Sequence, residues 1–393
     1  MLLSLAVLFG AGILFSGMAE KVRIPRLAGM ILAGIIIGPF ALNLLSDSLL
    51  NISADLRQIA LVIILIRAGL SLSLKDLKKV GRPAILMCFV PAVFEIIGVT
   101  LLAPKFLHIP VLDAAIMGTV LGAVSPAVIV PKMLKLMDEG YGTEKSIPQL
   151  ILAGASVDDV FVIVLFSAFT GLSQTGQFSA GTLLQIPLSI ATGLLIGYLG
   201  GRFWGFLYEK IPLKRAIQVL LFLSLAFVLV STEDLLEGIL PFSGLLATMM
   251  AGIAFQKDQP EISVDMAGSF NQLWQGAEIL LFVLVGATVD IQYATAAGPA
   301  TLLLIVSVLV FRMCGVWLSL LGTNLTKKER FFCVIAYMPK ATVQAAIGGI
   351  PLAMGLSNGE LILTVAVLSI LITAPVGAGL IEGTYTKLLE KHS

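Results

Sequence analysis

An apolar segment from about Ile147 to Leu172 carries two adjacent acidic residues, Asp158 and Asp159, near its middle. The segment is long enough to cross a bilayer. An ionisable residue at bilayer depth costs about 2.5–3.5 kcal/mol on insertion scales, and two like charges in contact resist joint ionisation. A bound cation or bound protons would offset this cost. The pair therefore predicts a site where protons and cations compete, with structural pairing or capping of a neighbouring helix as the alternative.

The composition is that of an integral membrane protein. Of the 393 residues, 58% are hydrophobic and only 12% are charged, whereas soluble domains carry about 25% charged residues. The net charge is only +1, and the sequence has no basic patch that would indicate binding of nucleic acid. All three cysteines lie within apolar segments, which argues against disulfides and a zinc site.

Hydropathy and helix-breaking residues predict about thirteen transmembrane helices. Of the 25 lysine and arginine residues, only Arg57 and Lys105 fall in loops on one face, whereas most of the others lie in loops and the tail on the opposite face. The positive-inside rule then places the N-terminus outside and the C-terminus in the cytoplasm of a multi-pass protein of the cell (inner or plasma) membrane. The predicted spans are 2–19, 25–42, 55–73, 82–103, 111–136, 146–172, 180–206, 215–232, 239–255, 267–289, 297–322, 328–354 and 358–386.

Two parts of the chain resemble each other in sequence. Residues 65–72 resemble 282–289 at an offset of 217 residues, and 25–39 resemble 241–254 at nearly the same offset. The third predicted helix thus matches the tenth, and an odd shift of seven helices places the two copies in opposite orientations. The sequence therefore predicts an inverted-topology repeat, as in many secondary transporters that bind their substrates near the midplane.

Prolines interrupt two predicted helices at corresponding positions of this repeat. The fifth contains Pro126 and Pro131, and the twelfth contains Pro339. Proline removes a backbone donor and breaks the hydrogen-bond ladder, and paired broken helices indicate a transporter site, where unwound carbonyls ligate a cation. For one helix alone, a simple kink is the alternative. We expect polar groups near Ser125 and Thr342 to support ion binding.

Several further ionisable residues lie within predicted spans, and three of them are candidates for charge compensation. Glu95 is in the fourth span and Arg312 in the eleventh, again 217 residues apart. Because symmetry-related positions can face each other across a pseudo-two-fold axis, we expect an ion pair that satisfies both groups. Lys340, beside the break in the twelfth span, is expected to balance the half-helix ends.

Three motifs together resemble those of the monovalent cation:proton antiporters, whose bacterial members include NhaA and NapA. They are Ser-Val-Asp-Asp-Val on the sixth helix, Val-Ser-Pro-Ala-Val on the fifth and Pro-Lys-Ala-Thr-Val-Gln-Ala-Ala on the twelfth. The resemblance covers nearly the whole chain. It implies an all-α fold with two crossed broken helices, a homodimer, and Asp159 as the residue that binds Na⁺ and carries the proton, with Asp158 beside it.

The resemblance also implies a division into domains. A core domain would contain the broken helices 111–136 and 328–354 and the helix 146–172 with its two aspartates. The implied boundaries are 1–80 and 215–296 for the dimerisation domain, 81–173 and 297–393 for the two core repeats, and 174–214 for a linker helix.

One position departs from the NapA-like pattern. Those proteins have a lysine on the helix equivalent to the eleventh, which pairs with the first aspartate, whereas this chain has Arg312. Arg312 together with Glu95 resembles the animal NHA exchangers, the 9B branch. Because arginine effectively cannot lose its proton, we expect Arg312 not to carry one.

These observations predict a sodium (or lithium)/proton antiporter that works by alternating access and is neither an enzyme nor dependent on a cofactor. The expected partners are monovalent cations, protons and the lipid bilayer. A potassium/proton antiporter stays open, as does a sodium-coupled organic anion symporter, although the latter fits the adjacent aspartates and the thirteen spans poorly. An intramembrane aspartyl protease would need its aspartates on separate helices, and proton-coupled flux of fixed stoichiometry would separate an antiporter from a channel.

Overall fold

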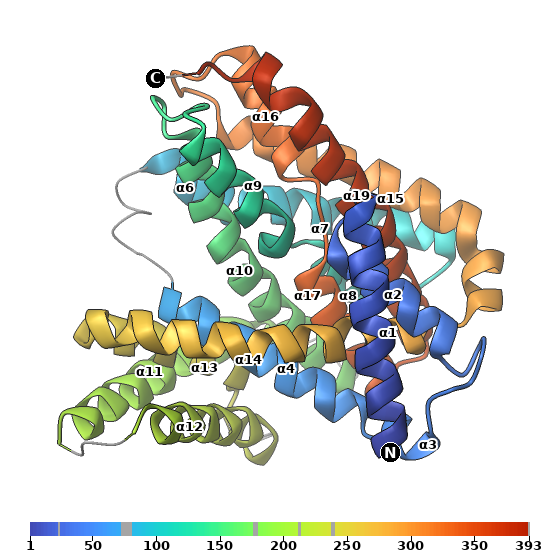
Figure 1. Ribbon diagram of the computed structural model, residues 1–393, viewed down its shortest axis with the longest axis vertical. Coiled ribbons are helices and arrows are strands. Elements are labelled where there is room, and N and C mark those ends of the chain that lie inside the picture. Colours follow the sequence, from blue (N-terminus) through green and yellow to red (C-terminus); the bar gives the residue numbers. More distant parts are fainter. Residues whose placement is uncertain (23, 72–80, 176–179, 211–213, 237–239, 392–393) are drawn as a thin grey trace. The chain divides into compact units, whose positions relative to one another are not determined.

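The computed structural model describes residues 1–22, 24–71, 81–175, 180–210, 214–236 and 240–391, and this part of the chain is helical without a β-strand (Figure 1). The helices are α1 (Leu2–Lys21), α2 (Arg26–Ile37), α3 (Asp47–Leu50), α4 (Ser53–Ser71), α6 (Arg82–Met87), α7 (Val90–Leu107), α8 (Val111–Leu121), α9 (Pro126–Asp138), α10 (Ile147–Thr175), α11 (Ala180–Lys210), α12 (Arg215–Leu235), α13 (Gly244–Asp258), α14 (Pro260–Ala287), α15 (Ile291–Ser319), α16 (Lys327–Ala336), α17 (Thr342–Ile347), α18 (Ile350–Ala353) and α19 (Gly359–Leu388).

Each predicted span overlaps at least one of these helices. By length and apolar composition, nine helical segments of the described chain could cross a membrane. The number of thirteen crossings stays a prediction. The predicted ends at 73 and 239, and parts of the predicted linker 174–214, lie outside the described residues.

The two predicted helix breaks are present. The fifth span divides at residues 122–125 between α8 and α9, and the twelfth at residues 337–341 between α16 and α17. Pro126 is the first residue of α9. An N–H at this position would have no hydrogen-bond partner within the helix, so proline is tolerated there. Pro131, also expected to break the helix, lies inside α9 without ending it.

Two further breaks lie beyond those at Pro126 and Pro339, and the first of them was not predicted. The span 82–103 divides at Cys88 and Phe89 into α6 and α7, with Pro91 in the first turn of α7. A proline ring collides with the carbonyl four residues earlier, which accounts for the break just before it. The twelfth span divides again at Gly348 and Gly349, before Pro351 in the first turn of α18.

The chain forms two compact units, and each has a helix crossing at glycines. One unit comprises Met1–Ala54, Ser73–Val162 and Ile279–Ser393, and the other Asp55–Leu72 and Ile163–Glu278. In the first, a Cβ on Gly34 of α2 would lie 2.0 Å from the Val283 carbonyl oxygen of α14. In the second, a Cβ on Gly69 of α4 would lie 2.3 Å from the Met249 carbonyl oxygen of α13. Only glycine permits either backbone approach.

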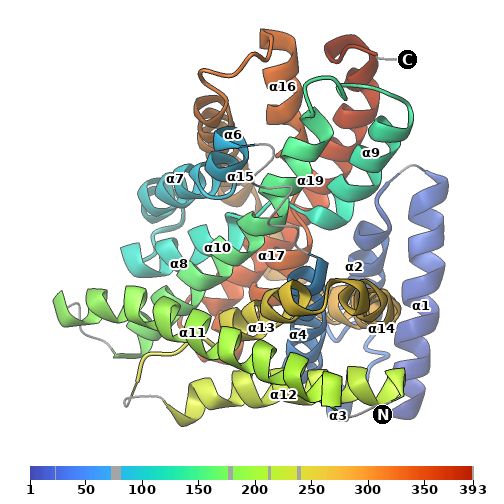
Figure 2. The ribbon, with the colours of Figure 1, turned by 90° about the vertical axis from the view of Figure 1, so that its left-hand side faces the viewer.

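The first unit contains both broken helices. Its helix α17 packs against α8 and against α19, and α7 packs along α15 (Figure 2). Ion pairs join other helix ends of this unit, with Lys132 and Lys135 of α9 both contacting Glu382 of α19. This packing brings residues more than 200 positions apart in sequence to the same breaks.

Candidate ion-binding site

The two helix breaks contact each other directly. The Ser125 backbone N–H, at the end of the first break, donates to the Pro339 carbonyl oxygen in the second at 2.8 Å. Four half-helix ends therefore lie in one region. All the site residues predicted from the sequence belong to this same compact unit.

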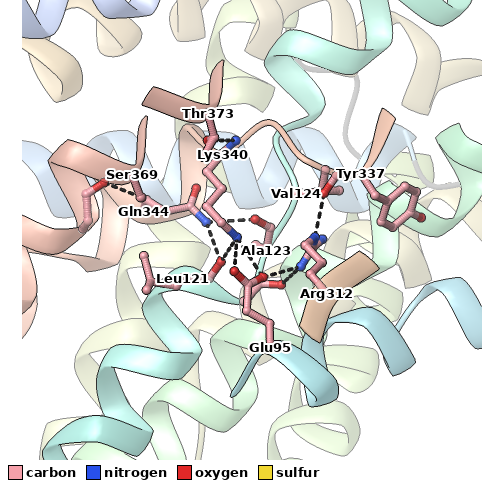
Figure 3. Close-up of polar contacts among 12 residues, drawn as sticks. Glu95, Leu121, Ala123, Val124, Arg312, Tyr337, Lys340, Gln344, Ser369 and Thr373 are labelled. Atoms are coloured by element: carbon pink, nitrogen blue, oxygen red, sulfur yellow. Dashed lines mark hydrogen bonds and ion pairs between the residues drawn. The ribbon is translucent and has the colours of Figure 1, made fainter. Parts of the chain in front are cut away.

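Arg312 of α15, only 1% exposed, is bonded to four groups in this region (Figure 3). Its Nε donates to the Tyr337 carbonyl oxygen at 2.7 Å, and its Nη1 donates to Glu95 Oε2 at 2.9 Å and to the Gly122 carbonyl oxygen. Its Nη2 donates to Asp158 Oδ2 at 2.8 Å. Because Gly122 and Tyr337 follow the last residues of α8 and α16, the guanidinium lies at the negative ends of both half-helices.

Lys340 forms the second cationic contact with Glu95. Its Nζ lies 2.6 Å from Glu95 Oε1 and donates to Oε2 at 2.8 Å, and it also donates to the carbonyl oxygen of Leu121, the last residue of α8 (Figure 3). Its backbone N–H donates to Thr373 Oγ1 of α19 at 3.0 Å. The predicted Glu95–Arg312 pair is thus present as part of a larger network, and Lys340 does contact a half-helix end as expected.

The two aspartates have different surroundings. Asp158 is fully buried, and its Oδ2 accepts hydrogen bonds from Arg312 and from the Val124 backbone N–H, the latter at 2.9 Å. Its Oδ1 has no hydrogen-bond partner in the described part of the chain. Asp159 Oδ1 is likewise buried and unpartnered there. Asp158 is therefore held in place by a cation and a backbone donor, whereas Asp159 forms no ion pair in the described part of the chain.

The formal charges of this site do not cancel when every group is ionised. Glu95, Asp158 and Asp159 carry three negative charges, and Arg312 and Lys340 carry two positive charges. The excess is one negative charge in a buried region, where an unpaired charge is costly. One monovalent cation or one proton would neutralise it.

Two hydroxyl groups at the breaks also lack described partners. Ser125 is the N-cap residue of α9, but its side chain makes no capping bond. Thr342 is the first residue of α17. Both side chains are buried, and neither hydroxyl oxygen has a hydrogen-bond partner among the described residues. Together with the unpartnered carboxylate oxygens, these hydroxyl oxygens could serve as ligands of a Na⁺ ion.

Several contacts of the site were not predicted. The contact of Arg312 with Asp158 was not predicted, and neither were the contacts of Gln344 and of the Val124 backbone. Gln344 donates from Nε2 to the Ala123 carbonyl oxygen at 2.9 Å (Figure 3). Two sequence signals could have indicated it, namely its place in the motif Pro-Lys-Ala-Thr-Val-Gln-Ala-Ala and its position in the first turn beyond a break.

Comparison with known proteins places these features in a family. Residues 5–386 match the family model for the sodium/hydrogen exchanger, transmembrane. The chain is 36% identical over 414 residues to sodium/hydrogen exchanger 9B2 of Xenopus tropicalis, a match that covers 98% of this chain and 74% of that protein. The chain belongs to the sodium/hydrogen exchanger family. The resemblance to this family predicted from the motifs is therefore confirmed.

Other members and a solved structure agree with this assignment. Human sodium/hydrogen exchanger 9B2 is 36% identical over 387 residues, covering 94% of this chain and 70% of that protein. Human sodium/hydrogen exchanger 9B1 is 32% identical over 420 residues, a match that covers 100% of this chain and 79% of that protein. The structure of the sodium proton antiporter MjNhaP1 from Methanocaldococcus jannaschii matches with a TM-score of 0.85 at 21% identity, over 98% of this chain and 97% of that one. The exchanger fold predicted from the sequence is thus confirmed, and this family member is a multi-pass membrane protein.

Proposed function

We propose that this exchanger-family protein is a sodium (or lithium)/proton antiporter in which Asp159 alternately binds the cation and the proton. The observation that carries the proposal is the single unbalanced negative charge of the buried site, at the carboxylate without a described partner. A site with one excess charge takes either one Na⁺ or one H⁺ but not both, and such competition is the requirement for exchange. The names of the similar proteins support the same function.

The other residues of the site have supporting roles in this proposal. Arg312 keeps its proton throughout and holds Asp158 in place. The hydroxyl oxygens of Ser125 and Thr342 supply neutral ligands when Na⁺ replaces the proton. Lys340 and Glu95 neutralise each other beside the half-helix ends.

The transport cycle we infer is alternating access. The core domain, 81–173 and 297–393, would move relative to a dimerisation domain, 1–80 and 215–296, with 174–214 as the linker. The protein would act as a homodimer in the cell (inner or plasma) membrane, with its N-terminus outside and its C-terminus in the cytoplasm. No cofactor takes part in this cycle.

The test is the dissipation of an imposed pH gradient by added cations in proteoliposomes that contain the purified protein. We expect Li⁺ and Na⁺ to dissipate the gradient. Proteoliposomes with Asp159→Asn protein serve as the control, because the carboxamide has nearly the same shape but cannot release a proton. A response to K⁺ with none to Na⁺ or Li⁺ would instead establish the potassium/proton alternative, and no response to any of the three would contradict antiport.

A further inference from the structure

The peptide group between Ala123 and Val124 is bonded at both ends to side chains of the core. Its carbonyl oxygen accepts from Gln344 Nε2 at 2.9 Å, and its N–H donates to Asp158 Oδ2 at 2.9 Å. A peptide group is planar, and its C=O and N–H point in opposite directions. A contact that fixes the orientation of this carbonyl therefore also fixes the orientation of the N–H that donates to Asp158.

Gln344 is the described residue that orients the carbonyl. The preceding carbonyl oxygens of Leu121 and Gly122 accept from Lys340 and Arg312, whereas the described chain offers Ala123 no donor besides Gln344. Gln344 is fully buried, and its Nε2 also lies 3.4 Å from the Leu121 carbonyl oxygen. Without it, the Ala123 carbonyl would be buried and unpaired, which favours rotation of the peptide toward another donor.

We propose that Gln344 is a positioning residue for cation exchange, which acts through the Ala123–Val124 peptide to hold Asp158. The inference rests on the proposed antiport function and extends it to a residue of the second broken helix. Asp158 has two described partners, Arg312 and the Val124 N–H. Losing the second frees the carboxylate to turn about its bond to Arg312, which changes the field and the ligand geometry at the adjacent Asp159.

Two substitutions remove the donor without a large change in shape. Gln344→Met has a similar length and no polar hydrogen, and Gln344→Leu has a somewhat shorter apolar side chain that likewise cannot donate. The matched control is Ser369→Ala, because Ser369 is buried in the same unit and its hydroxyl donates only to Ala366 of its own helix, at 2.6 Å (Figure 3).

The first measurement is Na⁺-driven proton movement in proteoliposomes as a function of Na⁺ concentration. We expect both Gln344 variants to raise the KM for Na⁺ about tenfold, the effect of losing one hydrogen bond to a charged group, with turnover within about twofold of the wild type. A purely structural role would instead reduce the amount of folded protein and leave the KM unchanged. Ser369→Ala is expected to match the wild type in both constants.

The second measurement is thermal stabilisation by Na⁺, which reports binding and needs no exchange. It is made on the wild type, Gln344→Met, Asp158→Asn and the double variant. If Gln344 acts through Asp158, the double variant should bind Na⁺ no more weakly than Asp158→Asn alone, because effects on one shared contact do not add.

Three results would overturn the inference. They are a wild-type KM in both folded Gln344 variants, independent additive losses in the double variant, and failure of both Gln344 variants to fold while Ser369→Ala folds. Absence of Na⁺-driven proton movement in the wild type contradicts the proposed function instead, and Na⁺-dependent thermal stabilisation then still decides the role of Gln344.

Discussion

Asp158 and Asp159 are neighbours on α10 with different contacts. Consecutive helix positions point about 100° apart, so one carboxylate can contact Arg312 while the other faces elsewhere. Asp158 has this cationic partner and Asp159 has none in the described chain. The difference supports the assignment of Asp159 as the exchanging group, which the sequence alone could not choose.

We expect Asp159→Asn to abolish exchange in a folded protein, because the carboxamide neither releases a proton nor offers a full charge to Na⁺. Asp158→Asn should damage exchange less and change the KM for Na⁺ before turnover. Proteoliposome exchange assays, with size-exclusion profiles as the check of folding, make this comparison. The opposite order of severity would require the two roles to be exchanged.

The Glu95–Arg312 pair should set stability without carrying protons. Removal of one partner of a buried pair typically costs about 3–5 kcal/mol, because it leaves the other charge unpaired. Arg312→Ala should cost more than Glu95→Ala, since Arg312 also bonds Asp158 and two half-helix ends. In a double-mutant cycle of thermal stability, the double variant should recover part of the loss. A cycle with no coupling energy would show that the pair is not in contact.

Among the helices, α16 begins with a reciprocal pair of side-chain caps. Thr326 Oγ1 accepts from the Glu329 N–H at 3.3 Å, and Glu329 Oε2 accepts from the Thr326 N–H at 2.7 Å, which forms a capping box. Lys145, two residues before α10, donates to both Glu329 oxygens at 2.9 and 3.0 Å. Glu329 thus caps the start of α16 and joins it to the segment that precedes α10.

Glu329→Ala should destabilise the protein by about 1 kcal/mol, the order of one lost hydrogen bond, because it leaves the Thr326 N–H without its side-chain acceptor. It also removes the partner of Lys145. Glu329→Gln should cost less, since the amide oxygen still accepts from the Thr326 N–H. Hydrogen bonding to Glu329 raises the pKa of Lys145, so this contribution is fully present below the usual lysine pKa of about 10.4 and is lost only above it. Thermal melts at pH 7, with Glu261→Gln in the first turn of α14 as control, measure both costs. Equal losses for Ala and Gln would contradict the capping role.

For the whole molecule, the site predicts electroneutral exchange of one Na⁺ for one H⁺. Arg312 is permanently charged, and Asp158 remains bonded to it, which leaves Asp159 as the carboxylate that changes partner. One cation then replaces one proton, and no net charge moves. The measurement is Na⁺-driven proton movement in proteoliposomes with the membrane potential clamped at several values. If the driving force changes with the membrane potential as it does when one net charge moves per cycle, this stoichiometry is contradicted.

The helices and the two main breaks could be predicted from the sequence because their causes are local. Apolar length predicts a span, and Pro126 and Pro339 lie where the backbone leaves the helix. The errors concern prolines whose effect on the helix also depends on the packing around them. Pro131 lies in α9 without ending it, and the break before Pro91 was missed, because neighbouring packing decides whether a proline ends, bends or only interrupts a helix.

The ionisable residues of the site, and the pairing of Glu95 with Arg312, followed from the sequence because a repeat of 217 residues relates their positions. The repeat does not relate Arg312 to Asp158, 154 positions away, so their contact could not be predicted from it. The contact of Gln344 with the Ala123 carbonyl could not be predicted from it either. An unwound backbone exposes several carbonyls and one side chain can reach any of them, so the crossing of the two broken helices alone decides which groups meet.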